Sequence, residues 1–232
     1  MIVIARPENE SYFGGVLGRL YESGTQMVCL SITRGEGSPI NLVTHDLSEL
    51  AERRTNELQE AARRLGIREV LILDEPDLSS LHVDGDWNQA RITSALEAIA
   101  QKFQPEVVLT LLPSHPLIDP QHQRAARLVL ELAQRGRLGS SLKGVYGAAE
   151  REWYPDDAFP DVEGQIEFAI DRYSRKIGMT YGEFQEHAAM AHASQITSQA
   201  GPPTVAEILV PLLEVSPDSR LCLENLSRAG VC

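Results

Sequence analysis

Polar side chains able to do chemistry stand in two short stretches of this sequence. Arg6, Glu8 and Asn9 directly follow an apolar run, and Asp119 and His122 stand three residues apart at the start of a predicted helix. A carboxylate can act as a general base, and imidazoles and carboxylates can bind a divalent metal ion. Because side chains three apart on a helix share a face, Asp119 and His122 can converge on one point. Arg6 is a permanent cation without a lone pair for a metal, so we expect it to pair with Glu8 or Asp119.

The elements that would position these residues alternate along the chain. Short apolar runs predict strands at residues 1–6, 26–32, 69–73, 106–111 and 142–147. Helical periodicity predicts helices at residues 13–23, 47–65, 88–103, 122–135 and 184–194. This alternation is typical of an α/β fold, in which a mostly parallel sheet carries helices on both faces. We expect one domain over residues 1–232, because a chain of this length can form a single core.

Composition limits the classes of partner. The net charge of −12 repels the phosphates of nucleic acids and anionic lipids, so we expect neither nucleic acid nor membrane as a partner. A small neutral or cationic ligand, or another protein, fits better. No segment approaches the ~18 apolar residues of a membrane span, and the start lacks a signal-peptide pattern, so we expect a cytoplasmic protein. The three cysteines are too few and too scattered for a disulfide framework and are expected as reduced thiols.

Five short motifs lie along the chain. They are ARPENE at residues 5–10, TRGEG at 33–37, R-x-x-E at 54–57 with LGI at 65–67, DPQHQRAA at 119–126, and A-x-x-x-H-A-S-Q at 188–195. In this order they resemble the PIG-L or LmbE family of zinc-dependent N-deacetylases (N-acetylglucosaminyl-phosphatidylinositol de-N-acetylase-like). The family's motifs are AHPDDE, TRGExG, R-x-x-E with LGV, HPDHRA and A-x-x-x-H-x-S-Q. The resemblance covers most of the chain and implies a Rossmann-like sheet.

The resemblance also implies a role for each position of the site. In the family, two His and one Asp bind zinc, an adjacent Asp takes a proton from the metal-bound water, and a further His stabilises the oxyanion. The zinc-ligand positions are occupied here by Arg6, Asn9 and His122, so only His122 keeps the ligand type. Glu8 stands at the general-base position and Asp119 at the oxyanion position, which makes these two the candidate catalytic residues.

Two more residues have competing interpretations. Arg54 matches a family position that contacts the substrate, and it could equally be a surface arginine paired with Glu57, three residues away. His192 has a family counterpart that does not bind metal. We interpret it as a helix-end residue whose ring bonds to the backbone.

One hypothesis explains the substituted positions by charge replacement. A site without its zinc ion would leave buried carboxylates uncompensated, which is costly, and Arg6 supplies a fixed positive charge in its place. An amide at Asn9 removes one negative charge at the same time. The candidate ligand-binding residues are then Arg6, Asn9, Arg54 and His122, with no metal and no other cofactor expected.

The alternative hypothesis is a relocated metal site. Glu8, Asp119 and His122 would bind zinc, with His115 as a fourth ligand. Arg6 would then lie beside the metal, and like-charge repulsion disfavours this arrangement.

These hypotheses lead to two functions. The first is a deacetylase homologue and pseudoenzyme that binds a small molecule, such as an amino sugar or an amide-bearing metabolite, or a partner protein, without hydrolysis. The second is an active amide hydrolase or N-deacetylase acting on an N-acetyl amino sugar through Glu8, Asp119 and His122. Either function is compatible with a homo-oligomer, and neither fixes the substrate.

Overall fold

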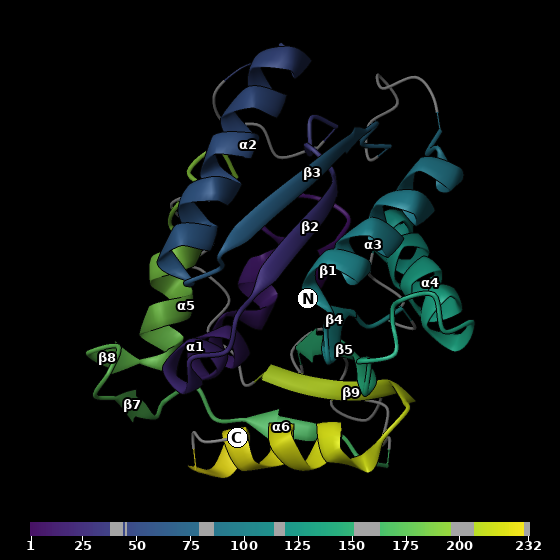
Figure 1. Ribbon diagram of the computed structural model, residues 1–232. Helices are drawn as coiled ribbons and strands as arrows, with labels where there is room; N and C mark the ends of the chain where they lie inside the picture. Colours follow the sequence, from purple (N-terminus) through teal and green to yellow (C-terminus); the bar gives the residue numbers. More distant parts are fainter. Residues whose placement is uncertain are drawn as a thin grey trace.

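A seven-stranded, mostly parallel sheet forms the centre of the protein, in a computed structural model that describes residues 1–37, 44, 46–78, 86–113, 119–150, 163–195 and 207–229 (Figure 1). Its strands are β1 (Ile2–Ile4), β2 (Val28–Thr33), β3 (Glu69–Glu75), β4 (Val107–Leu111), β5 (Gly144–Glu150), β6 (Ile166–Phe168) and β9 (Glu207–Glu214). The strand order is β3-β2-β1-β4-β5-β9-β6. Strands β1 to β5 are parallel to one another, whereas β9 is antiparallel to both β5 and β6.

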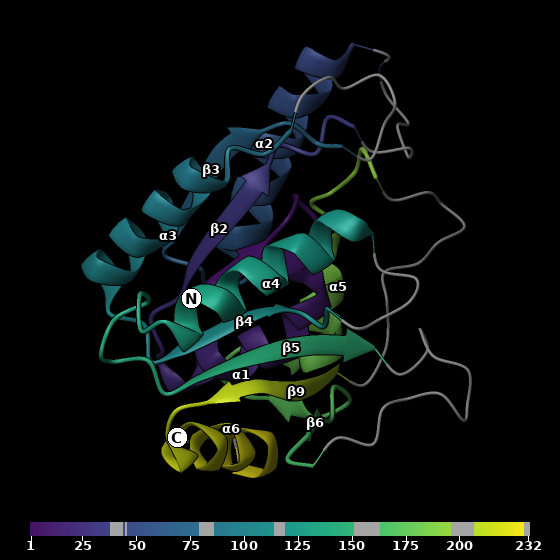
Figure 2. The ribbon, with the colours of Figure 1, turned by 90° about the vertical axis from the view of Figure 1, so that its right-hand side faces the viewer.

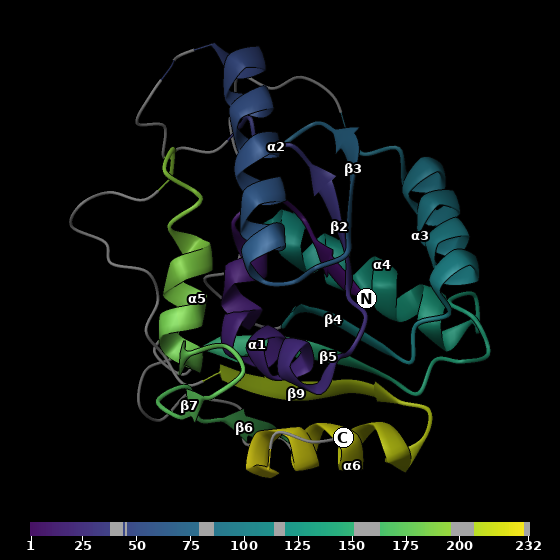
Figure 3. The same ribbon diagram turned by 60° about the vertical axis from the view of Figure 1, so that its left-hand side comes forward.

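Helices cover both faces of this sheet (Figures 1 and 3). They are the 3-10 helix η1 (Asn9–Phe13), α1 (Gly14–Ser23), α2 (Leu47–Arg64), α3 (Gln89–Phe103), α4 (Pro120–Gln134), α5 (Tyr181–Ala189) and α6 (Pro217–Ala229). Successive residues of a strand point to opposite faces, so Ile2 and Ile4 enter one core with α1, α2, α5 and α6. Val3 enters the other core, with α3 and α4. Figure 2 shows α6 beside β9 and β6, at the end of the sheet farthest from β3.

Local chemistry explains where the helices begin and end. The Asp46 side chain caps α2 by accepting hydrogen bonds from the backbone N–H of Ser48 (2.8 Å) and Glu49 (3.1 Å). Gly66, just after the C-cap of this helix, has a φ of 72°, and a Cβ there would lie 2.2 Å from the Tyr21 ring. Asp119 caps α4, whose first residue is Pro120.

The predicted α/β class and the mostly parallel sheet are confirmed. The five predicted strands correspond to β1–β5, and the five predicted helices to α1–α5. The predicted boundaries are wrong by up to five residues: α4 begins at 120 rather than 122, and α5 runs over 181–189 rather than 184–194. The sequence reading missed β6, β9, α6 and the hairpin formed by β7 (Tyr173–Ser174) and β8 (Met179–Thr180).

Two simpler expectations have different outcomes. Cys29 is a buried free thiol as expected, but Cys222 is disulfide-bonded, so the expectation of reduced thiols is wrong for that residue. Among the helices of the described residues, none combines the length and the apolar character that a membrane span needs.

Candidate functional site

The candidate residues meet where the strand order reverses. The chain runs from β1 outward to β2 and β3, then returns to the other side of β1 to form β4 and β5. Open parallel sheets bind ligands at the carboxyl ends of their strands, at such a switch point. Arg6 and Glu8 follow β1, and Asp119 lies between β4 and α4. The fold therefore places both candidate stretches at the edge where α/β proteins bind ligands.

The Arg6 guanidinium bridges the two stretches. Its Nε lies 3.0 Å from Oε1 of Glu8, and its Nη1 lies 3.1 Å from Oδ2 of Asp119. The three side chains are 17–21% exposed, so they are partly shielded from solvent but accessible to a ligand. Burial alone would lower the pKa of Arg6, but Glu8, Asp77 and Asp119 raise it above its ordinary value. The predicted pairing of Arg6 is confirmed with both carboxylates.

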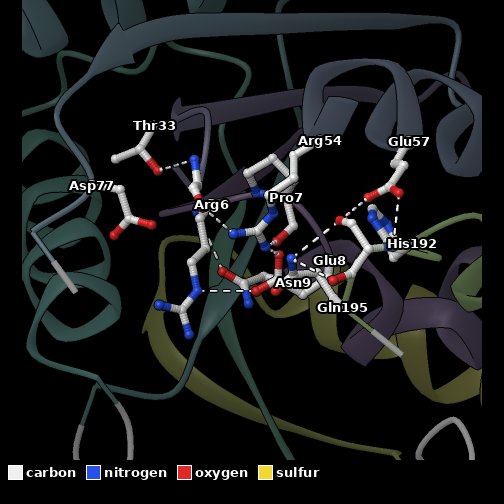
Figure 4. Close-up of polar contacts among 12 residues, drawn as sticks. Arg6, Pro7, Glu8, Asn9, Thr33, Arg54, Glu57, Asp77, His192 and Gln195 are labelled. Atoms are coloured by element: carbon white, nitrogen blue, oxygen red, sulfur yellow. Dashed lines mark hydrogen bonds and ion pairs between the residues drawn. The ribbon is translucent and has the colours of Figure 1, made fainter. Parts of the chain in front are cut away.

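Arg54 holds Glu8 from the opposite side (Figure 4). Its side chain is fully buried, pairs with Glu8 and donates hydrogen bonds to the carbonyl oxygens of Gly35 and Pro7, the latter at 3.2 Å. The interpretation as a surface arginine paired with Glu57 is wrong, because Arg54 extends from α2 into the loop after β1. Gly35 has a φ of 76°, and a Cβ there would lie 2.4 Å from the guanidinium. A substrate contact by Arg54 stays a prediction.

Asp77 belongs to the site, although it was not predicted from the sequence. Its carboxylate is fully buried and accepts hydrogen bonds from the backbone N–H of Gly37 (3.2 Å) and from Nε2 of Gln121 (2.7 Å). Figure 4 shows it beside Arg6. Asp77 follows β3 just as Arg6 follows β1, so the rule about strand ends could have identified it.

His122 lies in the same cluster and is buried, with 6% of its surface exposed. Its Nε2 has no hydrogen-bond partner among the described residues. Burial, and then the positive charge of Arg6, lower its pKa from 6.5 to about 4, against an opposing effect of Asp119 and Asp77. At neutral pH the imidazole is therefore uncharged.

Comparisons with known proteins identify the family. The model of the PIG-L family, described as GlcNAc-PI de-N-acetylase, matches residues 1–133, which is more than half of the chain. The chain belongs to this family. A curated relative, a 1D-myo-inositol 2-acetamido-2-deoxy-alpha-D-glucopyranoside deacetylase from Kineococcus radiotolerans, is 28% identical over 149 residues. That match covers 53% of this chain and 41% of the relative, so the chain spans about two fifths of that protein's length.

Solved structures share the fold of this PIG-L family chain. An N,N'-diacetylchitobiose deacetylase from Pyrococcus horikoshii has a TM-score of 0.63 at 19% identity, over 85% of this chain and 70% of that one. A 4-carboxy-2-hydroxymuconate hydratase from Pseudomonas putida KT2440 has a TM-score of 0.60 at 17% identity, over 91% and 95%. At these identities the likeness shows the fold alone. The fold therefore carries more than one reaction and does not define the activity of this chain.

The side chains of this PIG-L family chain do not fit a zinc ion at the positions that the resemblance implies. Arg6 offers no lone pair, and Oδ1 of the nearly fully buried Asn9 accepts the backbone N–H of Arg6 at 3.3 Å. Within the described ranges, no group of three or more His, Cys, Asp or Glu side chains could hold a metal ion. The relocated set of Glu8, Asp119 and His122 is thus not gathered into a metal site, because Arg6 bridges its two carboxylates. His115 lies outside the described residues.

A second polar network consists of Glu10 with His192 and Glu57 with Ser194. His192 and Glu10 form a buried pair, with side chains 1% and 0% exposed, so the interpretation that His192 bonds to backbone is wrong. Burial by itself lowers the pKa of His192, but Glu10, with help from Glu8 and Glu57, raises it above its ordinary value. Glu57 accepts hydrogen bonds from the backbone N–H (2.8 Å) and Oγ (2.6 Å) of Ser194. Glu10 belongs to η1 and Glu57 to α2, so these two buried carboxylates hold the segment after α5 against η1 and against α2.

Proposed function

We propose that this PIG-L family chain binds a small molecule, an amino sugar or a related amide-bearing metabolite, at the switch point and does not perform zinc-dependent hydrolysis. One observation carries the proposal: the guanidinium of Arg6 bridges Glu8 and Asp119. Arg6 thereby occupies, with a fixed charge, the position where the family resemblance implies a zinc-binding histidine.

Electrostatics supports charge replacement. Glu8, Asp77 and Asp119 surround Arg6, and carboxylates in a partly buried site are costly without a compensating cation. A zinc ion beside Arg6 would meet a like charge at short range. A zinc ion and the Arg6 guanidinium are therefore alternatives for the same position. The guanidinium is covalently part of the chain and cannot dissociate.

The residues that remain are suited to holding a ligand rather than to hydrolysis. Glu8 keeps the carboxylate of a general base, but Arg6 and Arg54 both pair with it, so both of its oxygens are already engaged in ion pairs. Asp119 is an anion at the position where an oxyanion would need a hydrogen-bond donor. The partly exposed oxygens of both carboxylates can accept hydrogen bonds from the hydroxyl or N–H groups of a sugar.

The metal content of the protein tests this proposal against the alternative of an active amide hydrolase. Protein purified without chelators should contain far less than one zinc per chain by elemental analysis. Stoichiometric zinc that is lost in His122→Ala would overturn the proposal and support the set Glu8, Asp119 and His122.

A series of reversions tests the same point more sharply. Arg6→His with Asn9→Asp restores two of the three protein ligands that a catalytic zinc needs, beside His122. Calorimetry should detect tight zinc binding by this double variant, and by the triple variant that adds Asp119→His, but not by either ligand reversion alone. Arg63→His, at an exposed position of α2, is the matched control for an added histidine. Tight zinc binding by Arg6→His alone, or none by the triple variant, would contradict the residue-by-residue assignment.

A further inference from the structure

A cavity lies at the end of the sheet opposite the candidate site. Its volume is about 380 Å³, and it is found where the amino ends of β1, β2 and β4 meet α1 and α6. Four apolar side chains of its lining are almost completely buried, at 1–4% exposure, and so form its floor: Ile2, Met27, Leu109 and Leu223. The candidate site lies at the carboxyl ends of the strands, so the two regions share no residue.

The mouth of this cavity is polar, but its polar side chains already have partners. Four exposed side chains line the mouth, and each bonds at 2.6–3.0 Å to a residue that does not line the cavity. The pairs are Thr25 with Ser23, Gln26 with Arg68, Gln104 with Gln101, and Glu106 with Lys143. Apolar contact is therefore the main interaction that the cavity offers a ligand.

The charges around the cavity are also compensated. Among the described residues that line it, Glu106 is the one charged side chain, and Lys143 pairs with it at 2.6 Å. The amino group of Met1 donates a hydrogen bond to the Val107 carbonyl oxygen at 2.8 Å. Burial lowers the pKa of this amine from 8.0 to about 5, so it is uncharged at neutral pH. An ionic ligand would thus lose its hydration without gaining an opposite charge.

We propose that this cavity is a second ligand site, which binds a small neutral molecule with an aromatic or aliphatic body. Small-molecule sites are concave and mostly apolar, with volumes of about 300–1,000 Å³, and this cavity falls within that range. Water is a poor competitor for the floor, because a buried water needs polar partners that apolar side chains lack. The proposal goes beyond the binding proposed for the switch point and does not depend on it.

N-phenyl-1-naphthylamine, a neutral probe whose fluorescence rises in apolar surroundings, tests the proposal with the full chain. We expect one molecule of the probe to bind per chain. Leu20→Trp should weaken this binding at least about tenfold, because Leu20 is a half-buried residue of the cavity wall and the larger ring would fill the space. Leu221→Trp is the matched control and should leave the affinity unchanged, because this residue of α6 is 55% exposed and does not line the cavity.

The methionines locate the bound probe without any substitution in the cavity. Met1 and Met27 line the cavity, whereas Met179 and Met190 do not. In wild-type protein with labelled methionine methyl groups, the probe should shift the NMR signals of the first two and leave those of the other two in place. This measurement decides the question even if Leu20→Trp fails to fold.

A charged analogue tests the neutral character of the site. 8-Anilino-1-naphthalenesulfonate has the same rings and adds a sulfonate, so we expect it to bind at least about tenfold more weakly than the neutral probe. Equal or tighter binding of the sulfonate would overturn the inference. So would an absence of probe binding, equal weakening by the two tryptophan substitutions, or NMR shifts confined to Met179 and Met190.

Discussion

His122 and His192 are both buried, at 6% and 1% exposure, but their pKa values are shifted in opposite directions. Burial lowers the pKa of both. At His122 the nearby guanidinium of Arg6 lowers it further, to about 4, whereas at His192 the carboxylate of Glu10 raises it above 6.5. Both neighbours come from the same short stretch after β1. Within five residues, therefore, this stretch supplies the cation of a partly exposed site and the anion of a buried structural pair.

The structural pair should show the larger effect on stability. His192→Ala removes the partner of Glu10 and leaves a carboxylate buried without compensation, so the free energy of unfolding should fall by about 3–5 kcal/mol. Chemical denaturation measures this. His187→Ala, at an exposed position of α5, is the matched control and should change the stability by less than about 0.5 kcal/mol. A loss at His192 no greater than that of the control would show that the pair does not hold the segment after α5.

The accessible site should tolerate the loss of its cation better. Arg6→Met leaves Glu8 and Asp119 facing each other, but both side chains are about one-fifth exposed and water screens their charges. We expect a loss of about 1–3 kcal/mol at pH 7, below that of His192→Ala. The same substitution at the exposed Arg63 should have no resolvable effect. A loss larger than that of His192→Ala would reverse the comparison.

The pH dependence of the two histidines is the smallest effect and has opposite signs. The folded pKa of His122, about 4, lies below its ordinary value of 6.5, so the folded state binds fewer protons between these values. Its contribution to stability therefore falls as the pH drops from 6.5 to 4. The pKa of His192 is raised, so its contribution is complete below pH 6.5 and is lost as the pH rises through the folded value.

Proton NMR titration of the imidazole C–H signals checks both directions. In Arg6→Met the pKa of His122 should rise, because the second cause of its depression is gone, while that of His192 should hardly move. Equal changes in the pKa values of His122 and His192 would mean that Arg6 acts on both histidines alike, so that their two clusters form one electrostatic network.

The residues of the site could be predicted from the sequence better than the buried pair and the strand β9 could. Arg6 and Asp119 could be placed together because parallel strands bring their carboxyl ends to one edge, a rule that needs only the strands. The pairing of Glu10 with His192 joins positions 182 residues apart through side-chain packing, which no local pattern encodes. Strand β9 was not predicted, because its partners β5 and β6 set its direction and Pro211 interrupts its pattern.

The position of β9 has a consequence for the order of synthesis. The strands β1 to β5 are complete by residue 150, but β9 pairs with β5 only after residues 207–214 have been made. Until then the nascent chain presents β5 as an open edge strand, a template for pairing with a neighbouring chain. Strand β9 thus covers the edge of β5 late in synthesis. We expect the growing polypeptide to depend on chaperones most in the interval between the synthesis of β5 and the emergence of β9 from the ribosome.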